Sequence, residues 1–246
     1  MQYTRKMQQW MWCGCLCVLV AFSLSEVALS APRSDTKIVM VIDDSGTVRK
    51  TEKDAGMTFE AMKEELFATL ARLRTQARFF GASVDVFVSS SGALVWSGKL
   101  ADLQSAKGLT LQKAIQGQGN RCNDLEKTFQ AIDHHLRFLN EDRFPNAKIF
   151  FLTGGFHSGT PCAQFKKIIY PSDLPAGVDF GAILTQKSAI NTIVIMGLHP
   201  AMQEKWGGAL APLLAWQKEQ PGRVFELYTD VQTPTALARG LEGVTQ

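Results

Sequence analysis

The sequence predicts an α/β protein with a doubly wound, mostly parallel central sheet, one antiparallel edge strand and helices on both faces. Short apolar runs alternate with amphipathic stretches along almost the whole chain, which is typical of parallel strands joined by crossover helices. One pair of runs, at 83–89 and 93–96, is separated only by a short Ser-Ser-Gly turn, which favours an antiparallel hairpin. Because no linker rich in Pro, Gly or Ser divides residues 31–246, we expect one domain there.

The first half of the chain supplies the opening strands and a helix. The run at 37–42 is continuously apolar after Lys37, as expected of a strand buried on both faces. Apolar residues recur every three or four positions across 58–77, which predicts an amphipathic helix. The hairpin follows, and residues 99–118 indicate only short helices or irregular chain.

The second half continues the alternation. Residues 123–139 have the clearest helical period, and Asn123 with Glu126 fits a variant of the capping box at the start of this helix. His134 and His135 lie off its apolar face, so we expect both at the solvated surface. The other predicted elements are a strand at 147–152, a helix at 180–188, a strand at 191–196, a helical stretch at 202–219 broken near Gly207-Gly208 and Pro212, a strand at 223–228 and a final helix at 233–241.

Residues 1–30 have the features of a secretory signal peptide. A positively charged start, an apolar run at 11–24 and small residues at 28–30 predict cleavage before Ala31. The alternative is an uncleaved membrane anchor, although the run is shorter than the roughly 20 apolar residues of a spanning helix. No second apolar stretch is long enough to span a membrane, so we expect a mature chain that is periplasmic or secreted.

Charge gives no argument for nucleic acid as a partner. The chain has 26 Lys and Arg against 23 Asp and Glu, a formal net charge of +3, and no block of like charge.

Two of the five cysteines, Cys122 and Cys162, lie beyond the predicted signal peptide. Exported compartments are oxidising, so we expect these two to form a disulfide bond.

The most informative stretch is Asp43-Asp44-Ser45-Gly46-Thr47, directly after the first strand. The carboxylate and hydroxyls of Asp43, Ser45 and Thr47 stand at alternate positions and can converge on one point, and oxygen ligands of this kind suit hard divalent cations. This motif and the order of elements resemble the von Willebrand factor A-type (vWA) domain over roughly residues 37–244. The resemblance implies a Rossmann-like fold, a metal-ion-dependent adhesion site and the binding of a protein partner.

The resemblance places that adhesion site in three segments of the chain. Asp43, Ser45 and Thr47 match the first segment completely, whereas Asn123 stands where the second has Thr, and Gly154 stands where the Thr-Asp-Gly of the third has Asp. Asn123 could offer an amide oxygen or cap its helix. Because one of two carboxylates is missing, the resemblance implies a degenerate site with weakened affinity for Mg²⁺, Mn²⁺ or Ca²⁺. The same polar residues also suit a metal-free loop in which they bond the turn backbone.

The loops at the carboxyl ends of parallel strands gather at one edge of the sheet, and we expect partner binding there. Cys122 and Cys162 should also meet at this edge. The alternative for the segment 154–179 is an irregular helix packed on the sheet. The residues predicted to contact a partner are Asp43, Asp44, Phe156, His157, Phe165 and Tyr170.

The predicted function is an exported vWA-type protein-binding module that acts in envelope assembly, adhesion or a secretion or transfer apparatus, with or without a divalent metal, and has no enzymatic activity. One alternative is a phosphatase, because Asp43 to Val48 is also similar to the Asp-x-Asp-Gly-Thr start of haloacid dehalogenase-type enzymes, with Asp43 as nucleophile. Ser45 stands where the general acid is needed, and Thr229-Asp230 offers only one carboxylate for magnesium. The other alternative is a purely structural domain whose metal site has decayed.

Overall fold

The computed structural model describes residues 35–44, 59–75, 81–104, 106–115, 123–155, 157 and 179–229. The chain divides into two compact units, Met1–Arg33 and Ser34–Gln246, and all described residues belong to the second unit. The predicted signal peptide and the predicted last helix lie outside the described residues. In the part of the chain that is described, no helix has the length and apolar character needed to cross a membrane.

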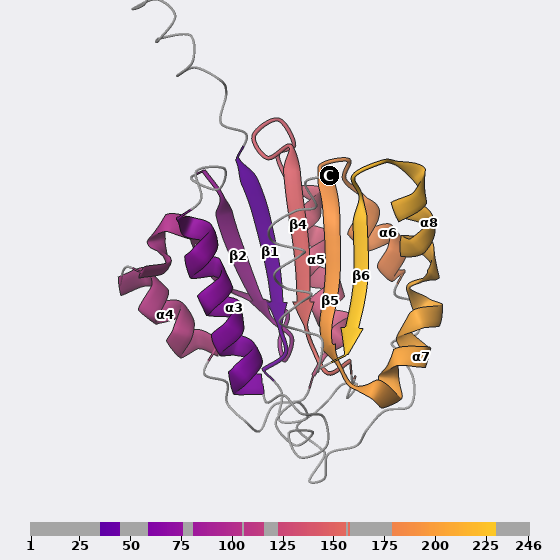
Figure 1. The fold of residues 1–246 in the computed structure, drawn as a ribbon, viewed down its shortest axis with the longest axis horizontal. Helices are drawn as coiled ribbons and strands as arrows, with labels where there is room; N and C mark the ends of the chain where they lie inside the picture. Colours follow the sequence, from indigo (N-terminus) through magenta and orange to yellow (C-terminus); the bar gives the residue numbers. More distant parts are fainter. Residues whose placement is uncertain are drawn as a thin grey trace, which may run out of the picture. The chain divides into compact units, whose positions relative to one another are not determined.

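A six-stranded sheet forms the centre of the second unit (Figure 1). Its strand order is β3-β2-β1-β4-β5-β6, and every neighbouring pair is parallel except β2 and β3. The predicted α/β class and mostly parallel sheet with one antiparallel edge strand are therefore confirmed. The strands are β1 (Thr36–Ile42), β2 (Ser83–Val88), β3 (Ala93–Lys99), β4 (Asn146–Leu152), β5 (Ile190–Leu198) and β6 (Val224–Thr229).

The helices follow the order that the sequence pattern predicts over the described residues. The weak stretch 99–118 contains the end of β3 and two short helices, and the stretch 202–219 contains two helices, with Pro212 in the first turn of the second. The helices are α3 (Phe59–Arg74), the 3₁₀ helix η3 (Leu100–Gln104), α4 (Ala106–Ile115), α5 (Leu125–Arg137), α6 (Phe180–Thr185), α7 (Pro200–Ala209) and α8 (Ala211–Glu219).

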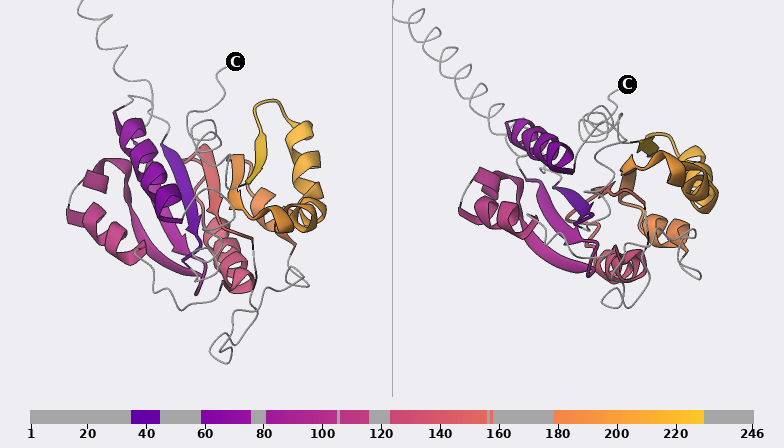
Figure 2. Two further views of the ribbon diagram at one scale, coloured as in Figure 1. Left: turned by 60° about the horizontal axis from the view of Figure 1, so that its bottom comes forward. Right: turned by 90° about the horizontal axis from the view of Figure 1, so that it is seen from below.

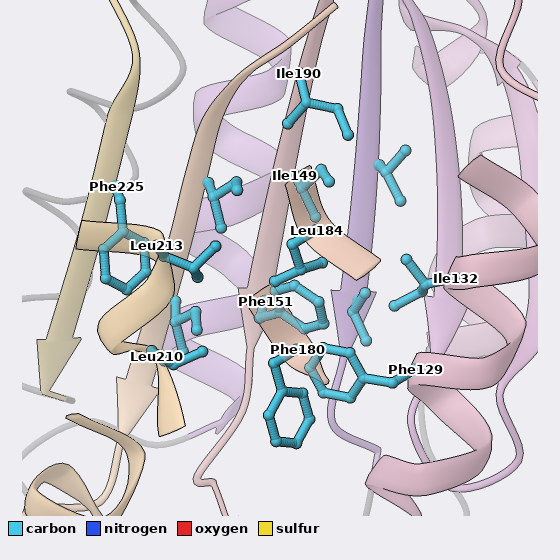
Figure 3. Packing of buried hydrophobic residues seen from close by; sticks show 14 of the residues in the cluster. Phe129, Ile132, Ile149, Phe151, Phe180, Leu184, Ile190, Leu210, Leu213 and Phe225 are labelled. Carbon is cyan, nitrogen blue, oxygen red and sulfur yellow. The ribbon is translucent and has the colours of Figure 1, made fainter. Parts of the chain in front are cut away.

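Side chains on the two faces of the sheet enter two separate apolar clusters. Successive strand residues point to opposite faces, so Met40 of β1 packs with residues of α3 and α4, whereas Val41 packs with residues of α5 to α8. Helices therefore lie on both faces (Figure 2). In the second cluster the Phe129 ring of α5 lies 5.1 Å from the Phe151 ring and 4.2 Å from the Phe180 ring, measured between centroids (Figure 3).

A buried ionic cluster joins three strands to α5. Asp85 of β2 is 1% exposed, and its carboxylate lies 2.5 Å from Lys37 Nζ and 2.6 Å from His135 Nε2 and accepts a 2.7 Å hydrogen bond from Ser97 Oγ. His135 was expected at the solvated surface beside His134, and for His135 this prediction is wrong. The helical period shows which residues lie outside the apolar face of α5, but it does not show that Asp85 of the sheet contacts His135.

These contacts shift the ionisation of Asp85. Burial raises the pKa of the carboxyl group, but hydrogen bonds from His135, Lys37 and Ser97 and the charge of Lys37 outweigh it and lower the pKa from 3.8 to about 2. The carboxylate therefore stabilises the fold.

This shift predicts a specific loss of stability in acid. Because the folded pKa lies below the unfolded value, the contribution of Asp85 is fully present above about pH 4 and is lost as the pH falls toward 2, for a total of about 2 kcal/mol. Urea unfolding of the wild type and of Asp85→Asn between pH 6 and pH 2 measures this contribution to the free energy of unfolding. The difference in unfolding free energy between the two proteins should shrink by about 2 kcal/mol over that range, and a difference that does not change with pH would contradict the assignment.

Candidate functional site

The carboxyl ends of five parallel strands share one edge of the sheet. Backbone hydrogen bonds continue the ladder past the strand ends, from Asp43 N to Leu152 O at 2.8 Å and from Thr153 N to Met196 O at 3.0 Å. We call this edge the rim, and it comprises the described residues Asp43, Asp44, Ser89, Ser90, Asn123, Asp124, Thr153, Gly154, Gly155, His157 and His199.

Three distant segments of the chain meet at Asp43. Asn123 Nδ2 donates hydrogen bonds to Asp43 Oδ2 at 2.8 Å and to Thr153 Oγ1 at 3.3 Å, and Thr153 Oγ1 donates to the same Asp43 Oδ2 at 3.0 Å. All three side chains are buried. We call this network the clasp, because it ties the end of β1 to the end of β4 and to Asn123, which lies two positions before the first residue of α5.

The cap of α5 is Asp124, and the predicted cap at Asn123 is wrong. Asp124 Oδ1 accepts a hydrogen bond from the backbone N–H of Lys127 at 3.1 Å, and Lys127 Nζ lies 3.4 Å from Asp124 Oδ2. Asn and Asp are both good caps, so residue type does not distinguish the two neighbours. Asp43 decides between them, because an acid cannot donate a hydrogen bond to it at neutral pH whereas the Asn123 amide can.

Removal of this cap should have a modest, measurable cost. Asp124→Ala leaves the N–H of Lys127 without its acceptor and removes a negative charge from the start of α5, so the free energy of unfolding should fall by about 1 kcal/mol. Asp124→Asn is the matched control, because it keeps a side-chain oxygen as the acceptor. Thermal or urea unfolding should show a smaller loss for Asp124→Asn, and equal losses would show that the cap is not the cause.

Asp44 connects the rim to the β2–β3 hairpin. Its two carboxylate oxygens accept hydrogen bonds from Ser90 N at 2.9 Å and from Ser90 Oγ at 2.8 Å. The backbone N–H of Asp124 donates to Ser89 O at 3.0 Å, so the hairpin turn also contacts the start of α5.

His157 also lies at the start of α5. Its Nδ1 accepts a hydrogen bond from the backbone N–H of Leu125 at 3.2 Å. Burial lowers the pKa of His157, and the nearby charges of Asp124 and Glu126 oppose this shift in part. The neutral imidazole is the form that can accept a hydrogen bond at Nδ1, so burial and geometry favour the same state.

The loop after β4 is fixed as far as Gly155. Gly155 has a φ of +83°, and a Cβ atom there would collide with the side chain of Leu198. Its carbonyl accepts a hydrogen bond from Trp206 Nε1 at 2.9 Å, and the carbonyl of Gly154 accepts one from His199 N at 3.1 Å. The loop is therefore held against β5 and α7.

Of the residues predicted to bind a metal or a partner, the rim contains Asp43, Asp44, Asn123 and His157. Thr153 is not among the residues predicted to bind a metal or a partner, yet it completes the clasp. Its position directly after a buried strand is the signal in the sequence that could have placed it there. Several predicted residues lie outside the described residues, so the disulfide bond, the hydroxyl ligands and the aromatic contacts stay predictions. These residues are Ser45, Thr47, Cys122, Phe156, Cys162, Phe165, Tyr170 and Asp230.

At Asp43 Oδ2, the described residues do not fit the divalent cation that the resemblance implies. Asn123 Nδ2 and Thr153 Oγ1 both donate hydrogen bonds to that oxygen, so partial positive charge already lies beside it. Asn123 Oδ1, the atom that could ligate a metal, is buried without a hydrogen-bond partner among the described residues, and Gly154 has no side-chain oxygen. Within the described ranges, no group of three or more His, Cys, Asp or Glu side chains is placed to hold a metal ion.

No model of a known protein family matches this chain, and no curated protein does. Among solved structures, a mutant of the minor pilin PilB from Streptococcus sanguinis is similar to it with a TM-score of 0.51 and 12% identity, over 85% of this chain and 60% of the pilin chain. Proximal thread matrix protein 1 from the mussel byssus has a TM-score of 0.47 and 13% identity, over 82% of this chain and 46% of its own. The chain thus spans less than two thirds of either, and the likeness to the pilin concerns the fold alone.

Proposed function

We propose that this protein is an exported protein-binding module of the vWA type, and that the rim is the surface that engages its partner. The clasp is the observation that carries the proposal. The resemblance assigns the site to three segments of the chain, and Asn123 and Thr153 lie 80 and 110 residues after Asp43 in the sequence. In the structure these three residues lie within hydrogen-bond distance of one another. A chance likeness in the first motif alone would not require this convergence.

The strand order supports the same location. In a doubly wound layout the order of strands reverses at one point, and ligands bind outside the carboxyl ends of the strands there. Here the order β3-β2-β1-β4-β5-β6 reverses between β1 and β4. The side chains that follow these two strands are Asp43 and Thr153, which are the two carboxyl-end members of the clasp.

The setting we propose is the cell envelope or the exterior, in envelope assembly, adhesion or a secretion or transfer apparatus. This part of the proposal rests on the signal-peptide features of residues 1–30. No catalytic step is proposed, because Asp43, the nucleophile in the phosphatase alternative, is 1% exposed and accepts two hydrogen bonds on one oxygen.

Affinity capture with a matched pair of variants tests the proposal. The purified protein is immobilised and exposed to a detergent extract of the envelope of the source cells. Asn123→Ala removes the amide that donates to Asp43, whereas Asn191→Ala removes an amide that donates to Asn146 Oδ1 at 3.1 Å at the opposite edge of the sheet. The wild type and Asn191→Ala should retain the same protein, and Asn123→Ala should lose it. Equal retention by all three would place the binding surface elsewhere.

A further inference from the structure

Asp43 is a buried carboxylate, and two hydrogen bonds to it offset part of the cost of burying its charge. Burial of a charge is costly unless hydrogen bonds or an opposite charge compensate it. One of its oxygens, Oδ2, accepts two hydrogen bonds, from an amide at 2.8 Å and from a hydroxyl at 3.0 Å. Hydrogen bonds to an ionised acceptor are roughly twice as strong as those between neutral groups, so these two donors supply a large share of the compensation.

The orientation of the Asn123 amide is imposed by its neighbours. Asp43 only accepts hydrogen bonds when it is ionised, and Thr153 Oγ1 has one hydrogen, which it donates to Asp43. If the amide were turned over, Asn123 Oδ1 would face Asp43 Oδ2, and two acceptors would meet. The nitrogen must therefore face the carboxylate, although this leaves Asn123 Oδ1 buried without a partner in the described structure.

We propose that Asn123 and Thr153 take the place of a cation at Asp43, so that the rim is assembled without metal and does not respond to it. The amide nitrogen and the hydroxyl both donate to Asp43 Oδ2 and so stabilise its charge without a metal, and the Gly154 position adds no second carboxylate to attract a divalent ion. The metal-free assembly of the rim does not depend on the proposed function. Only its consequence, that partner binding is independent of metal, rests on the proposed function.

Thermal unfolding of the purified protein tests the inference without a partner. The melting temperature of the wild type at pH 8 should be the same, within about 1 °C, in EDTA and in millimolar MgCl₂, MnCl₂ or CaCl₂. A ligand that binds only the folded state must raise the melting temperature once its concentration exceeds its dissociation constant. A rise of several degrees with any of the three ions would overturn the inference.

Asn123→Asp makes the test sharper, because it changes one donor into a second carboxylate with almost no change in shape. Two carboxylates would then face each other where the amide now bonds Asp43, so the melting temperature in EDTA should fall by about 4 to 8 °C. Millimolar divalent cation should restore at least half of this loss. Asn191→Asp is the matched control, because its amide faces the neutral Asn146 Oδ1, and its melting temperature should not depend on the cation.

The outcomes separate the inference from the proposed function. If Asn123→Asp is as stable as the wild type in EDTA, the amide does not compensate Asp43 and the inference fails. If Asn123→Asp does not fold, the melting temperature of the wild type in EDTA and in divalent cation still decides whether the rim responds to metal. Capture of the partner in EDTA distinguishes the two proposals: loss of capture only in EDTA would overturn metal independence and keep the function, whereas no capture in either buffer would overturn the function and leave the melting result intact.

Discussion

Asp85→Asn should lower the free energy of unfolding at pH 7 by about 3 to 5 kcal/mol. The substitution keeps the shape of the side chain but removes the carboxylate that lies 2.5 Å from Lys37 Nζ, and the Lys37 side chain is only 11% exposed. A buried cation is then left without a counter-charge. Urea unfolding followed by circular dichroism measures the loss.

An exposed ion pair gives the control for this experiment. Asp133 lies 2.7 Å from Arg137, whose side chain is 66% exposed, so Asp133→Asn should cost no more than about 1 kcal/mol. Lys37→Met combined with Asp85→Asn should recover part of the loss, because it removes the unpaired cation as well. If Asp85→Asn costs no more than Asp133→Asn, the cluster around Asp85 does not stabilise the fold in the way described.

Asp43→Ala should lower the free energy of unfolding by about 3 kcal/mol and abolish capture of the partner. It leaves two buried donors, Asn123 Nδ2 and Thr153 Oγ1, without the acceptor that they share, and each such loss costs about 1 to 3 kcal/mol. Urea unfolding gives the stability, and the capture assay gives the function.

Two further variants separate stability from binding at Asp43. Asp43→Asn keeps an oxygen that can accept both hydrogen bonds, so it should cost about 1 kcal/mol. Asp85→Asn should be at least as destabilised as Asp43→Ala but lies in the body of the sheet, and it should keep capture at a temperature where both variants remain folded. If Asp85→Asn loses capture to the same extent as Asp43→Ala, capture depends on stability alone, and the rim has no special role.

The sequence predicted the framework of this protein well because the framework depends on local pattern. The continuous apolar run at 38–42 predicts a strand buried on both faces, and β1 occupies Thr36–Ile42. The short Ser-Ser-Gly turn forces the antiparallel pair, and Pro212 explains why the stretch 202–219 forms two helices. The meeting of Asp43 and Thr153 also follows from pattern, because both residues come directly after parallel strands.

The errors concern side chains whose partners are distant in the sequence. Asn123 and Asp124 are adjacent and equally suited to cap α5, and only the position of Asp43, brought close by strand pairing, decides which one does. His135 has the sequence pattern of a surface residue, yet its side chain contacts Asp85. Asp85 is a polar residue with a valine on either side of it in β2. Such pairings depend on register and on the placement of helices over the sheet, which local pattern does not contain.

A photocrosslinking amino acid at Lys127 tests most directly whether the rim binds a partner. Lys127 lies in the first turn of α5 beside Asp124 with 56% of its side chain exposed, and Arg143 is a matched control near the other end of the sheet, before β4, with 62% exposed. Irradiation of cells that produce each variant should give a discrete adduct of higher mass from position 127 and none from position 143. The same adducts from both positions, or an adduct from position 143 alone, would contradict the account.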